Sequence, residues 1–150
     1  MDVTLPDGTR IRASSILERD DDDSTRAFGL YMDERWDPTW PAEIIAWPDF
    51  GLPAHPEYAA SQIQRAYARA RGGETVEIGC IGGRGRTGTV LACLAVLAGV
   101  NPPEAVAWVR SNYRSDAVEN VEQEAWVDWF ADHVRRADAS GESYSPDLRP

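Results

Sequence analysis

The sequence contains no lysine, little cysteine and histidine, and no long apolar run. All 15 basic residues are arginine, and the 150 residues include only 2 cysteines and 2 histidines. Two cysteines exclude a disulfide framework, and with so few histidines a four-ligand zinc site is not expected. The longest mostly apolar run, Val90 to Val100, is too short to cross a bilayer. We therefore expect no metal site and no membrane span.

Acidic residues dominate the charge. The chain has 25 acidic residues and a formal net charge of -10 at pH 7. Such a charge repels nucleic-acid backbones and anionic membrane surfaces at long range, so nucleic acid is not an expected partner. Residues 1–10 lack the apolar core of a signal peptide, and free thiols persist in a reducing compartment, which makes the cytoplasm the expected location. The sequence predicts no particular oligomeric state.

Length and residue periodicity predict one domain of the α/β class. Hydrophobic residues make up 43% and charged residues 27% of the chain, close to globular averages. The order of the predicted elements indicates a central, mixed and mostly parallel sheet flanked by helices over residues 1–139. Residues 140–150 are expected to form a flexible tail, and the acidic segment 18–25 a solvated loop. The predicted elements are a hairpin over 3–16, strands at 28–32, 43–47 (buried) and 75–78, and helices at 56–71, 87–98, 101–113 (with Asn101 as the capping side chain) and 120–136.

The segment from Gly79 to Thr89 joins a predicted strand to a predicted buried helix and carries the chemistry. It reads Gly-Cys-Ile-Gly-Gly-Arg-Gly-Arg-Thr-Gly-Thr. Its glycines let the backbone turn N–H groups inward, and together with the helix dipole such a loop binds anions. Cys80 faces those N–H groups, which stabilise its thiolate. The planar guanidinium of Arg86 can hold two oxygens of a phosphate.

Two more side chains complete a site for phosphate transfer. Thr87 can donate its hydroxyl to the Cys80 sulfur and stabilise the thiolate as a leaving group. Upstream, the segment Trp-Pro-Asp-Phe-Gly at 47–51 places Asp49 on a loop after a predicted strand. From that loop Asp49 can protonate a leaving oxygen and later activate a water. The residues predicted to bind phosphate are Ile81, Gly82, Gly83, Arg84, Gly85 and Arg86, and residues 80–86 are called the glycine-rich loop below.

The Cys-x-x-x-x-x-Arg-Thr pattern with an upstream Trp-Pro-Asp resembles the cysteine-dependent protein tyrosine phosphatase superfamily. The chain length fits its compact dual-specificity-like branch best. Segment 47–53 looks like the mobile acid loop of that superfamily. The resemblance implies the following roles: nucleophile for Cys80, phosphate binding for Arg86, support of the thiolate for Thr87 and general acid for Asp49.

Two positions qualify the resemblance. Segment 114–123 is similar to a downstream segment in which a glutamine helps to position the hydrolytic water, which implies that role for Gln123; the alternative is that Gln123 is the third residue of a helix capping box after Asn120. The family usually has a histidine just before the cysteine, where this chain has Gly79. That histidine helps to fix the loop and tune the thiol. Its replacement affects the expected rate but removes no group that makes or breaks bonds.

The resemblance implies a phosphomonoesterase that acts through a cysteinyl-phosphate and needs no metal or organic cofactor. The favoured substrate is a protein carrying phosphotyrosine, with phosphoserine and phosphothreonine as further substrates of a dual-specificity enzyme. Two alternatives stay open. Arg84 either adds one positive charge that raises the local potential or holds a second phosphate, as in a phosphoinositide, an inositol phosphate or an RNA 5′ end. Gly79 suggests a non-catalytic phosphate-binding module. Cys93 is expected to be a small buried thiol, with a disulfide to Cys80 under oxidation as the alternative.

Overall fold

The structure is a computed structural model that describes residues 1–17 and 26–139. The acidic segment 18–25 and the predicted tail at 140–150 lie outside the described residues. Within the described part of the chain, no helix is both long and apolar enough to cross a membrane.

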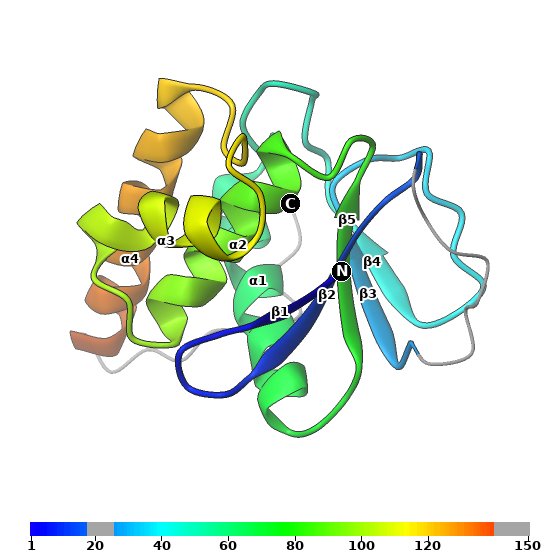
Figure 1. The fold of residues 1–150 in the computed structure, drawn as a ribbon, viewed down its shortest axis with the longest axis horizontal. Coiled ribbons are helices and arrows are strands. Elements are labelled where there is room, and N and C mark those ends of the chain that lie inside the picture. Colours follow the sequence, from blue (N-terminus) through cyan, green and yellow to red (C-terminus); the bar gives the residue numbers. More distant parts are fainter. Residues whose placement is uncertain (18–25, 140–150) are drawn as a thin grey trace.

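Five strands form one sheet in the order β1-β2-β5-β3-β4 (Figure 1). β1 (Asp2–Thr4) and β2 (Arg10–Ser15) make the predicted hairpin and pair antiparallel. β5 (Val76–Cys80) lies at the centre and runs parallel to both β2 and β3 (Phe28–Tyr31), while β4 (Ala42–Ile44) runs parallel to β3 at the edge. The prediction of a mixed, mostly parallel sheet is therefore confirmed.

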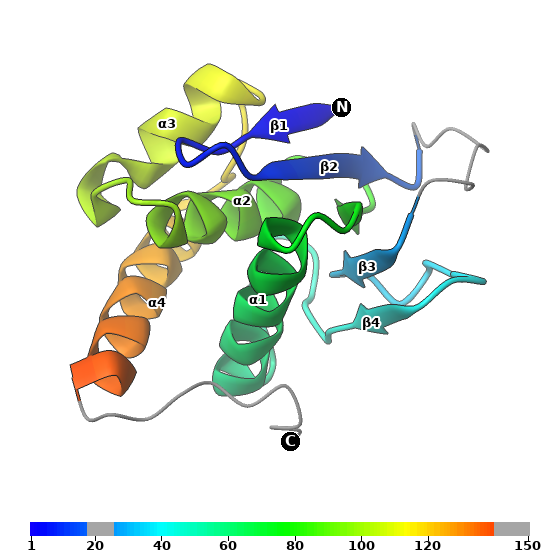
Figure 2. The same ribbon diagram turned by 90° about the horizontal axis from the view of Figure 1, so that it is seen from below.

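The helices lie together on one side of this sheet (Figure 2). α1 (Pro56–Arg71) has the predicted bounds, because proline suits a first helical position and Gly73, with a φ of +98°, ends the helix without strain. α2 (Gly85–Leu97) is almost entirely buried, between β5 and the other helices. α3 (Ala105–Asn112), which follows a short 3-10 turn, and α4 (Val121–Ala139) pack against α2 from the side away from β5.

Among residues 1–17 and 26–139, helices flank one face of the sheet, and a loop lies on the other face. Successive side chains of a strand point to opposite faces of the sheet. The register pairs Gly79 of β5 with Tyr31 of β3, so both residues are on the same face, the one opposite the helices. On this face the indole of Trp36 stacks on the Tyr31 ring, with centroids 4.1 Å apart. Trp40 donates its indole N–H to the Tyr31 hydroxyl. Aromatic side chains of segment 33–41 thus replace a helix here.

Three local predictions are wrong. The strand expected to be buried at 43–47 is an edge strand that ends at Ile44, because it pairs with β3 alone and the chain then leaves the sheet; the buried side chains there are Ile45 and Trp47. α2 begins two residues earlier than predicted, since the Gly88 N–H already closes a helical turn on the Arg84 carbonyl. Asn101 makes no side-chain cap bond: its carbonyl accepts the Glu104 N–H and starts a 3-10 turn.

Candidate active site

Cys80 is the last residue of β5, and its sulfur has two hydrogen-bond donors. The Gly83 N–H lies 3.2 Å and the Thr87 hydroxyl 3.0 Å from Cys80 Sγ. The Gly83 N–H comes from the glycine-rich loop, whereas Thr87 lies in the first turn of α2. Cys80 also lines a cavity of about 240 Å³. The predicted Thr87 hydroxyl donor is present, and of the several loop N–H groups predicted to face this sulfur the structure shows a hydrogen bond from Gly83.

The curl of this loop depends on Gly83, which has a φ of +72°. A Cβ there would be strained and would lie 3.1 Å from the Tyr113 hydroxyl oxygen and 3.2 Å from Ser15 Cβ. Tyr113 donates its hydroxyl to the Gly83 carbonyl from the end of α3. Sequence reasoning treated Tyr113 only as the end of a helix, so its support of the loop was missed.

Arg86 is buried and is held by one of its three nitrogens. Its Nη1 donates to the carbonyls of Met32 and Trp47, at 2.7 and 2.8 Å, and to Asp33 Oδ2 at 3.0 Å. Its Nε has no partner among the described residues, and its Nη2 faces Asp49 Oδ1 at 3.4 Å. Nε and Nη2 form one edge of the guanidinium, which is the fork that takes two oxygens of a phosphate.

Asp33 is the functional side chain that sequence reasoning missed most clearly. It lies two residues after the end of β3 and is buried. Hydrogen bonds from Arg35, and then from Arg86, hold the pKa of Asp33 well below its usual range. The available signal was its place just after a strand parallel to β5, because the carboxyl ends of parallel strands meet at one edge of a sheet.

The acid loop reaches the same cavity. Asp49 and Phe50 both line it together with Cys80 and Arg86. Trp47 fixes the loop from both sides, since its indole N–H donates to the Gly51 carbonyl at 2.8 Å while its own carbonyl accepts from Arg86. Phe50 has a φ of +60°, an uncommon conformation for a residue other than glycine. The structure thus brings the predicted acid and the predicted phosphate-binding arginine together.

The start of α4 ties down the acid loop. Asn120 Nδ2 donates to the Phe50 carbonyl at 2.8 Å, and Gln123 Nε2 donates to the Gly51 carbonyl at 3.3 Å. Asn120 Oδ1 accepts the Gln123 N–H, which is half of a capping box, but Gln123 Oε1 accepts from Glu119 rather than from the cap residue. Gln123 is fully buried. It contacts the acid loop, and its role toward a water stays a prediction.

A second carboxylate, that of Glu119, lines the cavity. It lies against the start of α2, where a Cβ on Gly85 would come within 1.9 Å of Glu119 Oε1. Burial, and then the nearby Asp49 carboxylate, raise the pKa of Glu119. Sequence reasoning gave Glu119 no role in the site, and no local pattern marks it, because only the fold brings it to the cavity.

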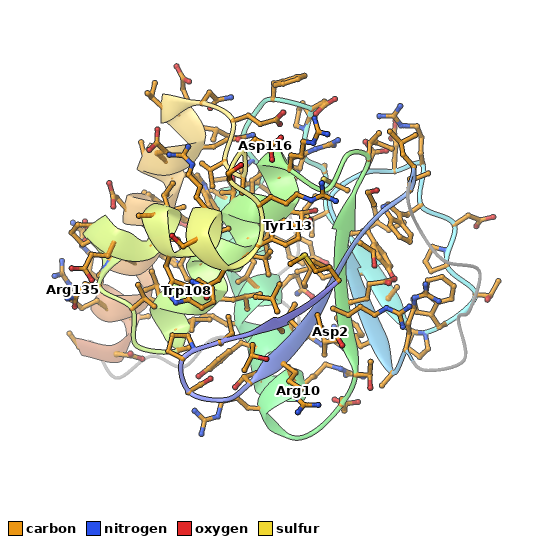
Figure 3. All side chains as sticks on the ribbon, viewed as in Figure 1. Asp2, Arg10, Trp108, Tyr113, Asp116 and Arg135 are labelled. Atoms are coloured by element: carbon orange, nitrogen blue, oxygen red, sulfur yellow. The ribbon has the colours of Figure 1, made fainter. Side chains whose placement is uncertain are left out.

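Arg84 lies at the mouth of the cavity and is already paired. Its Nε is 3.3 Å from Asp116 Oδ2, and both side chains are about half exposed. Figure 3 shows Asp116 at the end of the molecule where α2 begins. Any second phosphate would therefore compete with Asp116 for the positive charge of Arg84.

The remaining thiol lies away from this chemistry. Cys93 is free and fully buried in α2, and burial raises its pKa well above the usual value for a thiol. Among the described residues, no cluster of three or more histidine, cysteine, aspartate or glutamate side chains is placed to hold a metal ion.

Comparison with known proteins agrees with this geometry. Residues 52–126, half of the chain, match the family model described as "Swiss Army Knife protein, DSP-PTPase phosphatase domain". The uncharacterized protein MJECL20 of Methanocaldococcus jannaschii is 39% identical over 109 residues, which cover 65% of this chain and 71% of the relative. The crystal structure of Tk-PTP in the active form has 25% identity and a TM-score of 0.63, over 72% of this chain and 80% of that one. Human DUSP28 shares the fold, with a TM-score of 0.67 at 13% identity over 91% of this chain and 99% of its own.

Proposed function

Because the chain belongs to the dual-specificity-type phosphatase domain family of the cysteine-dependent protein tyrosine phosphatase superfamily, we propose that it hydrolyses phosphotyrosine in proteins through a cysteinyl-phosphate on Cys80. The observation that carries the proposal is the convergence of two separate segments on one cavity of about 240 Å³: the glycine-rich loop, which contributes Cys80 and Arg86, and the acid loop, which contributes Asp49. A binding module would have no use for a proton donor beside the arginine, so the convergence favours catalysis over binding alone.

In the first step the Cys80 thiolate attacks phosphorus in line. A sulfur–phosphorus bond forms as the bond to the leaving oxygen breaks, and Asp49 gives that oxygen a proton. The free edge of Arg86 and the N–H groups of the glycine-rich loop hold the non-bridging oxygens, where negative charge is concentrated in the transition state. The held Nη1 keeps this edge in place before substrate arrives.

In the second step a water attacks the cysteinyl-phosphate. Asp49 takes a proton from that water, the sulfur–phosphorus bond breaks, and inorganic phosphate leaves. The Thr87 hydroxyl, 3.0 Å from Cys80 Sγ, stabilises the departing thiolate. Gln123 holds the Gly51 carbonyl and so keeps the acid loop over the cavity during both steps. Every proton and electron pair in this scheme belongs to the chain, the ester or water.

The walls of the cavity favour an aromatic ester. Leu17 and Phe50 both line it and are 76% and 62% exposed. Exposed apolar side chains beside a phosphate site can cover the ring of a phosphotyrosine, whose burial is worth about 1.5–3 kcal/mol. A phosphoserine offers these walls only a methylene group. We therefore place phosphotyrosine above phosphoserine and phosphothreonine as a substrate.

The charges at the mouth disfavour a second phosphate. Arg84 is paired with Asp116, and Glu119 and Asp49 add two more carboxylates to the same cavity. A further anionic group on the substrate would be repelled by these three carboxylates and attracted only by Arg84, which is already paired with Asp116. No observation on the described residues favours a phosphoinositide, an inositol phosphate or an RNA 5′ end over a protein phosphomonoester.

Comparison of kcat/KM across substrates tests the proposal. We expect a phosphotyrosyl peptide to exceed a phosphoseryl peptide of the same sequence by about ten- to hundredfold, because only the former fills the apolar walls. Inositol phosphates and phosphoinositides should be poorer still. A preference for these anions would overturn the substrate assignment. Binding of vanadate without turnover of any ester would instead identify a phosphate-binding module.

A further inference from the structure

We propose that Trp36 is a positioning residue for the nucleophile, which holds the main chain of Cys80 from the face of the sheet opposite the helices. Trp36 Nε1 donates to the Cys80 carbonyl at 3.1 Å, and its side chain is buried. The Cys80 sulfur receives its own donors from the helix side of the chain. Cys80 is therefore gripped at two points, one on its sulfur and one on its carbonyl. The inference rests on the proposed role of Cys80 as the nucleophile.

Gly79 is the position that admits the indole. A Cβ on Gly79 would lie 2.7 Å from Trp36 Cζ2 and 3.2 Å from the Ser14 carbonyl oxygen. Any side chain at this position would have to displace the Trp36 ring. The indole that occupies this space comes from a segment that is distant in the sequence, and its ring N–H donates to the carbonyl of the next residue, Cys80.

A buried network keeps the indole still. Trp36 stacks on Tyr31, with centroids 4.1 Å apart and ring planes at 14°. The Tyr31 hydroxyl donates to Glu77 Oε1 at 2.6 Å, and Glu77 is fully buried beside Arg26, whose Nε is also 2.6 Å from Oε1. Burial, and then the hydrogen bond to Glu77, raise the pKa of Tyr31. A satisfied buried network of this kind rigidifies its members.

The same short segment also positions the arginine. Met32 donates its N–H to the Gly79 carbonyl at 2.9 Å and accepts Arg86 on its own carbonyl. Trp36 donates its main-chain N–H to the Asp33 carbonyl, while the Asp33 side chain holds Arg86. Segment 32–36 therefore sets the nucleophile and the phosphate-binding arginine in register with each other.

The expected effect of losing the indole N–H is modest, because the Cys80 carbonyl keeps one partner. The Ile16 N–H also donates to it, at 3.1 Å. With one of its two hydrogen bonds removed, the Cys80 carbonyl is less firmly held. The main chain of Cys80 can then move, which weakens the hydrogen bonds that the loop donates to the Cys80 sulfur. One hydrogen bond corresponds to a change of about two- to tenfold in kcat/KM.

Trp36→Phe and Trp40→Phe form a matched pair for the test. Each removes one indole N–H from the same loop and keeps an aromatic ring, but the Trp40 N–H serves the Tyr31 hydroxyl. We measure kcat and KM on an aryl phosphate, thermal stability, and the pH dependence of Cys80 alkylation by iodoacetamide with vanadate as the protecting anion. Trp36→Phe should lower kcat more than it changes KM and move half-maximal alkylation to higher pH. Trp40→Phe should leave both near the wild-type values.

Two further measurements test whether the effect comes from the contact between Trp36 and Cys80. Gly79→Ala, which displaces the indole, should reproduce the alkylation profile of Trp36→Phe. In the wild-type protein the indole N–H resonance of Trp36 should shift when Cys80 titrates or is alkylated, and that of Trp40 should not. Equal shifts for both tryptophans, or an unchanged alkylation profile in Trp36→Phe, would overturn the proposal. Absence of turnover in the wild type would reject the proposed function, while alkylation and resonance shifts would still decide the role of Trp36.

Discussion

Asp33 Oδ2 lies 3.0 Å from Arg86 Nη1, and this contact fixes the arginine by the edge that substrate does not use. We propose that the opposite edge, Nε and Nη2, takes the phosphate; in the structure its Nη2 faces Asp49 Oδ1 at 3.4 Å. The site is therefore organised before substrate binds, and its precision depends on a carboxylate that takes no part in bond making.

Asp33→Asn should lower kcat/KM by about ten- to hundredfold, the equivalent of one charged hydrogen bond. Arg35→Ala is the control, because Arg35 also binds Asp33 but is 63% exposed and does not line the cavity that contains Cys80. It should cost far less activity. Similar losses in both variants would mean that the segment as a whole, and not the contact with Arg86, matters.

The same variant has a pH signature. The pKa of Asp33 is lowered, so its carboxylate stabilises the folded state above the ordinary aspartate pKa of about 4. That contribution is lost as pH falls through the range below this value. The stability difference between wild type and Asp33→Asn should therefore be full at pH 7 and shrink under acid conditions in denaturant titrations. A difference that stayed constant down to low pH would contradict this assignment.

Asp49→Asn should lower kcat by about 10²–10⁴-fold with little change in KM, because a general acid acts in the transition state. The loss should shrink for esters with a good leaving group, which need no proton. Glu119→Gln is the matched control, since it neutralises another carboxylate of the same cavity. An equal loss for good and poor leaving groups would point to a structural role for the loop.

Glu119→Gln should tighten binding of phosphate and vanadate at pH 7 by up to about fivefold, because it removes a negative charge from the anion cavity. The raised pKa of Glu119 means that the fold disfavours its charged form. The gain in affinity and in thermal stability should therefore be largest above that raised pKa and fade at lower pH, where wild-type Glu119 is protonated. Weaker anion binding in the variant would show that Glu119 serves as an acceptor for substrate.

Arg84→Ala should cost about the same on substrates with one phosphate and with two, because Asp116 already compensates the charge of Arg84. The check is kcat/KM on a matched pair of phosphopeptides, with Asp116→Asn as the control that frees Arg84. A selective loss on the doubly phosphorylated substrate would restore the alternative of a second phosphate subsite.

Most of the fold follows from local sequence. The glycines after 71, the proline at 56 and the apolar run after residue 86 mark helices whose ends the structure reproduces within a few residues. The prediction of a buried strand at 43–47 was wrong, because the local pattern does not show where the edge strand ends and the buried side chains of the following segment begin. The sequence also did not predict that Trp36 and Trp40 cover one face of the sheet, because this depends on ring contacts with Tyr31 of β3.

The candidate site also contains residues that the sequence identifies and residues that only the fold reveals. Cys80, Arg86, Thr87 and Asp49 lie in motifs whose spacing reveals them. Their partners do not: Asp33 and Tyr113 contact the site only because strand and helix ends meet there. From the sequence alone, Gly79 indicated only the loss of the usual histidine. The three-dimensional contact with Trp36 gives it a physical reason.

The proposed mechanism is tested most directly by acid-quenched intact-mass and peptide analysis during turnover of an aryl phosphate. We expect one phosphoryl group on the peptide that contains Cys80, formed at the rate of the first step. We expect no such adduct and no turnover in Cys80→Ser, which should keep its fold and still bind vanadate. Release of phosphate without any adduct on Cys80, together with substantial activity in Cys80→Ser, would contradict the central claim.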